Sequence, residues 1–166
     1  PAVSELLARL CLIRNPIIRR VYDPACGSGS LLLKFAKTIG RNNPDLKYYG
    51  QEINPSTYNL CRINMFLHGI SFDNFDIQLG DTLIEPKHID RVSTCILFDA
   101  ITSNPPYSIK WEGEDNPILI NDDRYAPAGV LAPKSKADLA FIMHILYMLS
   151  ESGVAAIVEF PGVLYR

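Results

Sequence analysis

The sequence predicts an α/β domain in which a mostly parallel sheet is flanked by helices. Short apolar runs alternate with segments of helical periodicity along the 166 residues, a pattern typical of repeated strand–helix units. Four of the apolar runs end in loops that hold Gly, Asp, Glu or Asn, as the functional ends of parallel strands often do. With 48% hydrophobic residues, the chain can bury the core of one domain over residues 1–166.

Each element has its own signal. The predicted helices repeat apolar residues on one face, and the first three finish near Pro16, Gly40 and Gly69. The predicted strands are apolar runs bounded by turn residues. In chain order, the elements are a helix over Val3–Leu12, a strand over Ile17–Tyr22, a helix over Leu31–Ile39, a strand over Leu46–Ile53, a helix over Ser56–His68, strands over Phe75–Leu79 and Ile96–Thr102, a helix over Asp138–Leu149 and a strand over Val154–Phe160.

Residues 108–137 interrupt this alternation. They hold Pro117, Pro127, Pro133, Gly113 and Gly129, which predict a long irregular insertion rather than another strand–helix unit. Loops of this length inside a compact domain are usually functional or mobile, so we expect one of the two here.

Charge and hydropathy exclude several classes of protein. Sixteen basic and eighteen acidic residues leave a formal charge of −2, which argues against a free-standing nucleic-acid binder. Any contact with DNA would then be local or shared with a partner. No apolar run approaches the roughly 20 residues that cross a bilayer, and residues 1–9 lack a signal-peptide pattern, so no membrane association is predicted.

Neither the cysteines nor the histidines have metal-ligand spacing, so no metal site is predicted. The four cysteines contain no CxxC pair, and reduced thiols in a cytoplasmic protein fit best. The three histidines, which do not cluster in the sequence, are expected to be surface or packed residues. These residues are Cys11, Cys26, Cys61 and Cys95, and His68, His88 and His144.

The loop after the first strand, DPACGSG at residues 23–29, has the glycines of a ligand-binding turn. Gly27 and Gly29 permit a tight strand-to-helix turn in which the backbone approaches a ligand. A dinucleotide fingerprint would place another glycine where Leu32 stands, and no GK[ST] sequence follows, so neither a pyrophosphate site nor a P-loop is predicted. The loop suits a nucleoside without a pyrophosphate; the alternative is a purely structural turn.

Two carboxylates follow at the ends of the next two strands. Glu52, 23 residues beyond Gly29, can accept both hydroxyls of a ribose, unless it is simply a solvated side chain at a strand end. Asp81 can accept an amino group of adenine, and its alternative role is a turn or helix-cap residue.

The sequence NPPY at the end of the fourth strand is the strongest signal. Its prolines restrict the backbone, so that the carbonyl of Pro105 and the side-chain oxygen of Asn104 can face a common space. Two such acceptors suit one planar NH₂ group. Tyr107 offers a ring on which a base can stack, worth about 1–3 kcal/mol. The alternative is a Pro-rich turn that merely ends a strand.

In this order, DPACGSG, an acidic strand end, GDTL and NPPY resemble the S-adenosylmethionine-dependent amino-methyltransferases. Residues 110–149, with KWEG, DDRY and GVLAPKSKADLAFIMHILYML, are similar to the modification (methylation) subunit of type I restriction–modification systems, which methylates adenine N6 in DNA. The resemblance runs from about Val3 to Arg166. It implies a Rossmann-like S-adenosylmethionine-dependent methyltransferase fold in a chain that is part of a longer protein.

The resemblance also implies roles for individual residues. Those expected to bind S-adenosylmethionine are Asp23, Ala25, Cys26, Gly27 and Gly29 at its methionine end, Glu52 at its ribose, and Asp81, Thr82 and Leu83 at its adenine. Those expected to hold a flipped target adenine are Asn104, Pro105, Pro106 and Tyr107. The implied partners are DNA, a specificity subunit and a restriction subunit.

Two other functions stay open at this point. A protein glutamine methyltransferase also handles a planar NH₂ group, although the APKSKAD segment argues against it, and a non-catalytic assembly subunit could keep the same fold. Trp111 and Tyr125 could touch DNA or anchor the 108–137 segment to the domain. Lys134 and Lys136 are the candidates for phosphate contacts.

Overall fold

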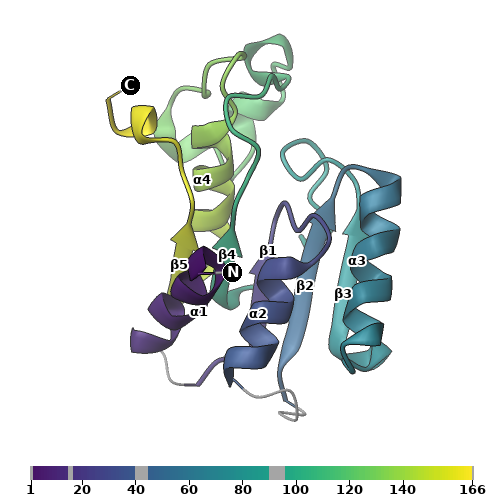
Figure 1. Cartoon of the computed structure of the whole chain (residues 1–166). Helices are drawn as coiled ribbons and strands as arrows, with labels where there is room; N and C mark the ends of the chain where they lie inside the picture. Colours follow the sequence, from purple (N-terminus) through teal and green to yellow (C-terminus); the bar gives the residue numbers. More distant parts are fainter. Residues whose placement is uncertain (1, 15–16, 40–44, 90–95, 166) are drawn as a thin grey trace.

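A computed structural model describes residues 2–14, 17–39, 45–89 and 96–165, and it contains the predicted parallel sheet. Five parallel strands lie in the order β3-β2-β1-β4-β5 (Figure 1). Their bounds are β1 Arg20–Asp23, β2 Lys47–Glu52, β3 Phe75–Leu79, β4 Phe98–Ser103 and β5 Leu149–Ile157. The proposed helix ends at Pro16 and Gly40, and the thiol of Cys95, lie outside the described residues.

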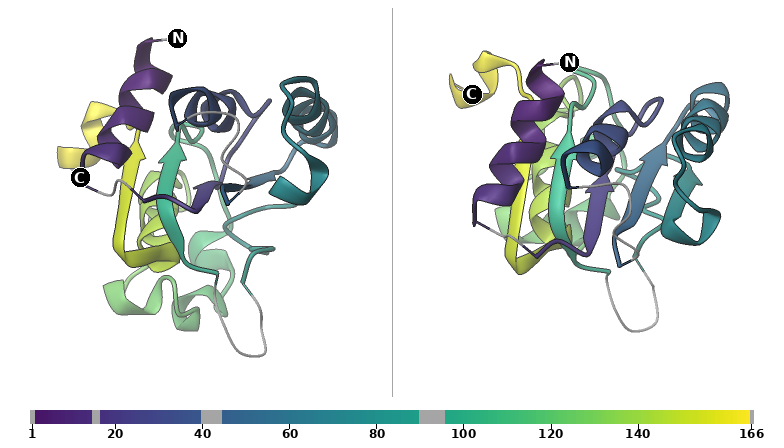
Figure 2. Two further views of the ribbon diagram at one scale, coloured as in Figure 1. Left: turned by 90° about the horizontal axis from the view of Figure 1, so that it is seen from below. Right: turned by 60° about the horizontal axis from the view of Figure 1, so that its bottom comes forward.

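The helices cover both faces of the sheet. They are α1 Ala2–Arg14, α2 Ser30–Ile39, α3 Pro55–Leu67 and α4 Asp138–Met148. Helices α1, α2 and α3 lie on one face and α4 on the other (Figure 2). All four predicted helices are therefore confirmed. No helix within the described ranges has the length and apolarity that a bilayer crossing requires.

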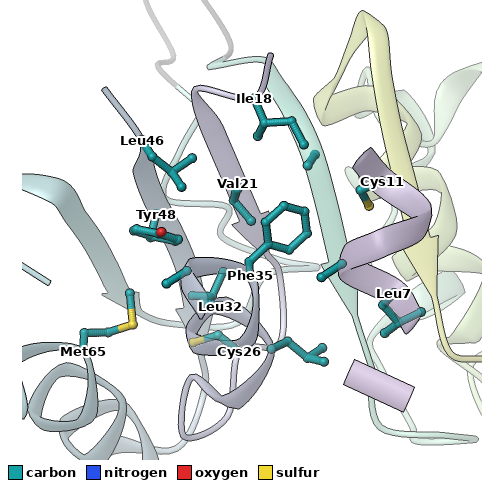
Figure 3. Close-up of a cluster of buried hydrophobic side chains, with 14 of the residues drawn as sticks. Leu7, Cys11, Ile18, Val21, Cys26, Leu32, Phe35, Leu46, Tyr48 and Met65 are labelled. Carbon is teal, nitrogen blue, oxygen red and sulfur yellow. The ribbon is translucent and has the colours of Figure 1, made fainter. Parts of the chain in front are cut away.

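Alternating side chains of the strands fill a separate core on each face. In β1, Val21 packs into the cluster beneath α1–α3, together with Leu32 and Phe35 (Figure 3). Its neighbour Tyr22 points into the opposite cluster, where its ring stacks on Phe98 with centroids 4.5 Å apart. Because successive side chains of a strand face opposite ways, β1 is buried on both sides, as a central parallel strand must be.

The strand order reverses at β1, which has β2 on one side and β4 on the other. The chain moves outward from β1 through β2 to β3 and then crosses back to β4. In open parallel sheets, such a reversal leaves a crevice at the carboxyl ends of the two strands concerned. This crevice lies between DPACGSG and NPPY.

Three strand boundaries were predicted wrongly by three or more residues, and one of them is the end of β5, which is Ile157 rather than Phe160. β1 begins at Arg20 rather than Ile17, and β5 begins at Leu149 rather than Val154. The start of β5 is polar and partly exposed, so it has no apolar run that could have been recognised. It is held instead by pairing of Leu149 with Phe98, which is followed by a shift in register before the regular ladder begins at Ala100 and Val154.

The 108–137 segment is more compact than the irregular insertion that its prolines and glycines predict. It forms three short 3₁₀ helices, at Gly113–Asp115, Leu119–Asn121 and Ala126–Ala128. Hydrogen bonds from the Ala137 N–H to the Ile109 carbonyl (3.0 Å) and from the Trp111 N–H to the Lys134 carbonyl (3.1 Å) close its base. In Figure 1 the segment, in green, lies above α4 at the end of the molecule where the strands finish.

Candidate active site

Two hollows open at the carboxyl ends of the strands, and they meet at Asn104. One, of about 400 Å³, lies against the ends of β2 and β3 and is lined by Glu52 and Asp81. The other, of about 440 Å³, lies against DPACGSG and the start of α1. Among the residues that the structure describes, only Asn104 and Ala25 line both. The reversal of strand order thus brings the predicted cofactor residues and the predicted base-binding motif to one place.

The loop after β1 is bound to the end of β2 by its backbone. The Cys26 N–H donates to the Gln51 carbonyl (3.0 Å), and the Gly27 N–H donates to the Glu52 carboxylate (3.0 Å). Gly27 has a φ of +53°, and a Cβ there would meet nothing within 4 Å. The loop is therefore fixed while the Gly27 position stays open to the second hollow.

Gly29 has a packing role in addition to the cofactor role that the resemblance implies. Its φ is +81°, and a Cβ there would lie 2.8 Å from the Cys61 sulfur in α3. Gly29 lines neither hollow. In this structure the residue lets the start of α2 approach α3 closely, which is a packing role.

Asp23 is buried at the junction of β1 and β4. Its Oδ1 accepts hydrogen bonds from the Ala25 N–H (3.1 Å) and the Ser103 hydroxyl (3.2 Å). Burial raises the pKa of the Asp23 carboxyl to about 7; the two hydrogen bonds oppose this rise and the charge of Glu52 adds to it. The side chain thus joins the ends of the two strands that flank the crevice.

Glu52 is held in one orientation by two backbone donors. Its Oε1 accepts from the Asn54 N–H (2.8 Å), and its Oε2 accepts from the Gly27 N–H (3.0 Å). A carboxylate oxygen can accept more than one hydrogen bond, so both remain able to accept from a ligand in the hollow that Glu52 lines.

Three residues of the loop after β3, which are Asp81, Thr82 and Leu83, take structural roles as well as lining the first hollow. Asp81 accepts from the Leu83 N–H (2.9 Å), so the turn role left open by the sequence is present. Thr82 donates to the Pro24 carbonyl (2.6 Å), which ties this loop to DPACGSG. Leu83 is buried among Trp111, Tyr125 and other members of the 108–137 cluster.

The NPPY motif places two of its four residues on the surface of the second hollow. Asn104 is exposed, and the Tyr107 hydroxyl donates to its Oδ1 (2.5 Å). Tyr107 is 44% exposed, whereas Pro105 is buried and lines neither hollow; Pro106 lines the first. The Asn104 oxygen, which the sequence predicts to accept a hydrogen bond from a substrate, therefore already accepts one from Tyr107.

Trp111 and Tyr125 anchor the 108–137 segment rather than presenting their rings to solvent. Both are buried and their rings pack edge to face. Lys134 forms an ion pair with Asp115, and neither it nor Lys136 lines the two hollows. His144 and His88 are buried and His68 is exposed, as expected for packed and surface histidines.

Sequence reasoning missed several residues that line the first hollow. Ile53 is 64% exposed there, and its signal is an apolar side chain directly after Glu52 at a strand end. Phe141 reaches the same hollow from α4, and nothing in the sequence connects it with strands so far from it along the chain. The others are Pro24, Gln51, Gly80, Ile109 and Lys110, and Trp111, which the sequence suggested as a DNA contact or an anchor, also lines this hollow.

Comparison with known proteins decides the family. The family model for N-6 DNA methylases matches residues 1–166. The chain belongs to the N-6 DNA methylase family. A type I restriction enzyme MpnII methylase subunit from Mycoplasma pneumoniae is 52% identical to this N-6 DNA methylase chain, over 99% of the chain and 31% of the relative.

Solved structures agree in fold. The type I restriction–modification system methyltransferase subunit from Streptococcus thermophilus superimposes with a TM-score of 0.88 and 41% identity, over 99% of this chain and 34% of that one. A Listeria monocytogenes protein described as a class I S-adenosylmethionine-dependent methyltransferase has a TM-score of 0.68 at 16% identity, over 99% of this chain and 46% of that one. The Rossmann-like methyltransferase fold predicted from the motifs is confirmed, and this chain spans about a third of the type I relatives.

Proposed function

We propose that this chain is the catalytic domain of a type I modification subunit that transfers a methyl group from S-adenosylmethionine to adenine N6 in DNA. The main structural support is the position of Asn104, which lies where the two hollows meet at the reversal of strand order. Membership of the N-6 DNA methylase family supports the reaction class. Similarity to type I methylase subunits supports the kind of system.

The residues around the crevice fit S-adenosylmethionine by their chemistry. Glu52, oriented by two backbone N–H groups, suits a pair of ribose hydroxyls. Ile53 and Leu83 provide apolar walls for a flat ring in the same hollow. The Gly27 N–H is already donated to Glu52, so the loop does not offer that donor to a phosphate. The set therefore suits a nucleoside that carries no phosphate. When bound, S-adenosylmethionine supplies a methyl group already activated on a sulfonium.

The protein's own contribution is to orient and hold the acceptor amine. The lone pair of an adenine amine is delocalised into the ring, which makes it a poor nucleophile. The Asn104 side-chain oxygen would accept from one N–H bond of this amine and help to direct the lone pair toward the methyl group. The resemblance implies the Pro105 carbonyl as the second acceptor, although Pro105 lines neither hollow in this structure. The Tyr107 hydroxyl donates to the Asn104 oxygen (2.5 Å), and an amide oxygen can accept a second hydrogen bond, so an incoming amine would either share this oxygen with Tyr107 or replace the Tyr107 hydrogen bond.

The target base must leave the duplex to reach Asn104, at a cost of a few kcal/mol. Stacking on the half-exposed ring of Tyr107 would return about 1–3 kcal/mol of that cost. The net charge of −2 supports shared rather than independent DNA binding. We therefore propose a specificity subunit that selects the DNA site, with a restriction subunit in the same system.

The test is base-modification sequencing of DNA from cells that express the full-length protein with its specificity subunit. Wild type is expected to place N6-methyladenine at one split motif, and Asn104→Ala is expected to lose it while S-adenosylmethionine binding persists. Asn121→Ala, an exposed asparagine that lines neither hollow, is the matched control and should methylate normally.

Two results would contradict the proposal. Methylation by Asn104→Ala would remove the role assigned to that side chain. Absence of modified adenine with the wild-type protein would favour a protein amide as acceptor, or a subunit that serves only in assembly.

A further inference from the structure

Arg124 is the largest fully buried side chain of the described residues, although a guanidinium carries a permanent charge. It lies in the 108–137 segment, 2% exposed, and lines neither hollow of the active site. Burying a charge is costly unless every donor is satisfied and the charge is paired. The contacts of Arg124 therefore indicate why it is there.

All five N–H donors of Arg124 have acceptors. Two go to the Asp122 carboxylate, from Nε to Oδ1 (2.9 Å) and from Nη2 to Oδ2 (2.8 Å), which pairs the charge. Nη1 donates to the Thr82 carbonyl (2.8 Å) and Nη2 to the Leu83 carbonyl (2.8 Å). The fifth donor, on Nη1, faces His144 Nδ1 at 3.2 Å.

His144 completes the arrangement as a neutral acceptor. Because arginine can only donate, Nδ1 of His144 must be unprotonated, and its remaining proton lies on Nε2, which faces the Tyr22 hydroxyl oxygen at 3.1 Å. Burial, together with the positive charge of Arg124, lowers the pKa of His144 to about 3, so the ring stays neutral near pH 7.

The two carbonyls that Arg124 holds belong to the loop after β3, one wall of the first hollow. Tyr125 adds a third bond, from its hydroxyl to the Leu83 carbonyl (3.0 Å). The same loop is tied to DPACGSG through the Thr82 hydroxyl (2.6 Å to the Pro24 carbonyl). The 108–137 segment thus sets the position of both loops that are proposed to contact the cofactor.

We propose that Arg124 is a positioning residue for S-adenosylmethionine, acting through the Thr82 and Leu83 carbonyls rather than by contact with the cofactor. This inference rests on the proposed function. A planar fork that binds two adjacent carbonyls and a carboxylate at once fixes the spacing of the loop backbone, which a single ammonium cannot do. Loss of the Arg124 guanidinium should therefore change the Kd and KM for S-adenosylmethionine more than the kcat of the transfer step at Asn104.

The test uses the full-length protein with its specificity subunit. Arg124→Lys keeps the charge and removes the fork, and Tyr125→Phe removes one hydrogen bond without leaving a buried charge. The control is Leu119→Ala, in the same buried cluster but outside both hollows. We would measure the thermal midpoint, the Kd for S-adenosylmethionine by calorimetry, and kcat with the KM for cofactor and for DNA.

Arg124→Lys is expected to raise the Kd and KM for S-adenosylmethionine by about tenfold or more, the size of one lost charge-assisted hydrogen bond. Its kcat at saturating cofactor and its KM for DNA should stay near wild type. Tyr125→Phe should raise the same two constants by about threefold, as one neutral hydrogen bond predicts. Leu119→Ala should lower the thermal midpoint without changing the Kd.

The inference would be overturned if the Kd for S-adenosylmethionine is unchanged in Arg124→Lys, or if it rises by the same factor in Leu119→Ala. Either result would mean that Arg124 only stabilises the fold. If Arg124→Lys does not fold, an unchanged Kd in Tyr125→Phe overturns it. A wild-type protein that binds S-adenosylmethionine but methylates no adenine would refute the proposed function, while the Kd comparison would still decide the role of Arg124.

Discussion

Gly29→Ala is the substitution that separates packing from cofactor binding in the DPACGSG loop. The added Cβ would lie 2.8 Å from the sulfur of Cys61, which is fully buried in α3, and the φ of +81° is one that alanine rarely adopts. The left-handed conformation costs about 1–2 kcal/mol. Overpacking against a buried neighbour costs about 1–3 kcal/mol. The free energy of unfolding is therefore expected to fall by about 2–5 kcal/mol.

Gly27→Ala is the matched control. Its φ of +53° carries a similar conformational cost, but a Cβ there meets nothing within 4 Å. We expect a loss of only about 1–2 kcal/mol. Since Gly27 lines the second hollow and Gly29 does not, the affinity for S-adenosylmethionine should fall in Gly27→Ala and stay near wild type in folded Gly29→Ala.

Urea denaturation followed by circular dichroism measures the two losses, and calorimetry measures the two affinities. The double variant Gly29→Ala/Cys61→Ala removes the sulfur that the new methyl group meets, so it should lose less than the sum of the two single changes. Equal destabilisation of Gly27→Ala and Gly29→Ala, or strict additivity in the double variant, would refute the packing role of Gly29.

Three further predictions concern the active site. Glu52→Ala should raise the Kd for S-adenosylmethionine by about tenfold or more, because it removes the ribose acceptor and leaves two backbone N–H groups without their partner; an unchanged Kd by calorimetry would contradict this role. Folding raises the pKa of Asp23 from 3.8 to about 7, so its contribution to stability is complete below pH 3.8 and is lost as the pH rises toward 7. Asp23→Asn cannot ionise and should gain stability over wild type across that window, by a few kcal/mol at about 1.4 kcal/mol per pKa unit; a difference in thermal midpoint that does not change with pH would count against it. Tyr107→Phe should keep adenine methylation, because it retains the stacking ring and frees the Asn104 oxygen, whereas Tyr107→Ala should lower kcat/KM by about tenfold or more; equal activity of the two variants would exclude stacking.

Much of the fold could be predicted because helices and strands leave local patterns. The predicted order of helices and strands is present, and the residues at the ends of β1, β2 and β4 face one crevice, as their positions after apolar runs indicate. The early start of β5 could not be predicted, since its polar first residues are held by pairing with β4 and not by burial of their own side chains.

By itself, the sequence determined the alternation of strands and helices, and it predicted the type of ligand for the DPACGSG loop and a role for Asn104. These follow from periodicity and from the chemistry of neighbouring residues. The tertiary structure alone decided that Ser103 meets Asp23, that Gly29 packs on Cys61 and that Arg124 holds the loop after β3. Such contacts join residues tens of positions apart. They depend on which strands become neighbours and which helix covers them, and no local pattern records that.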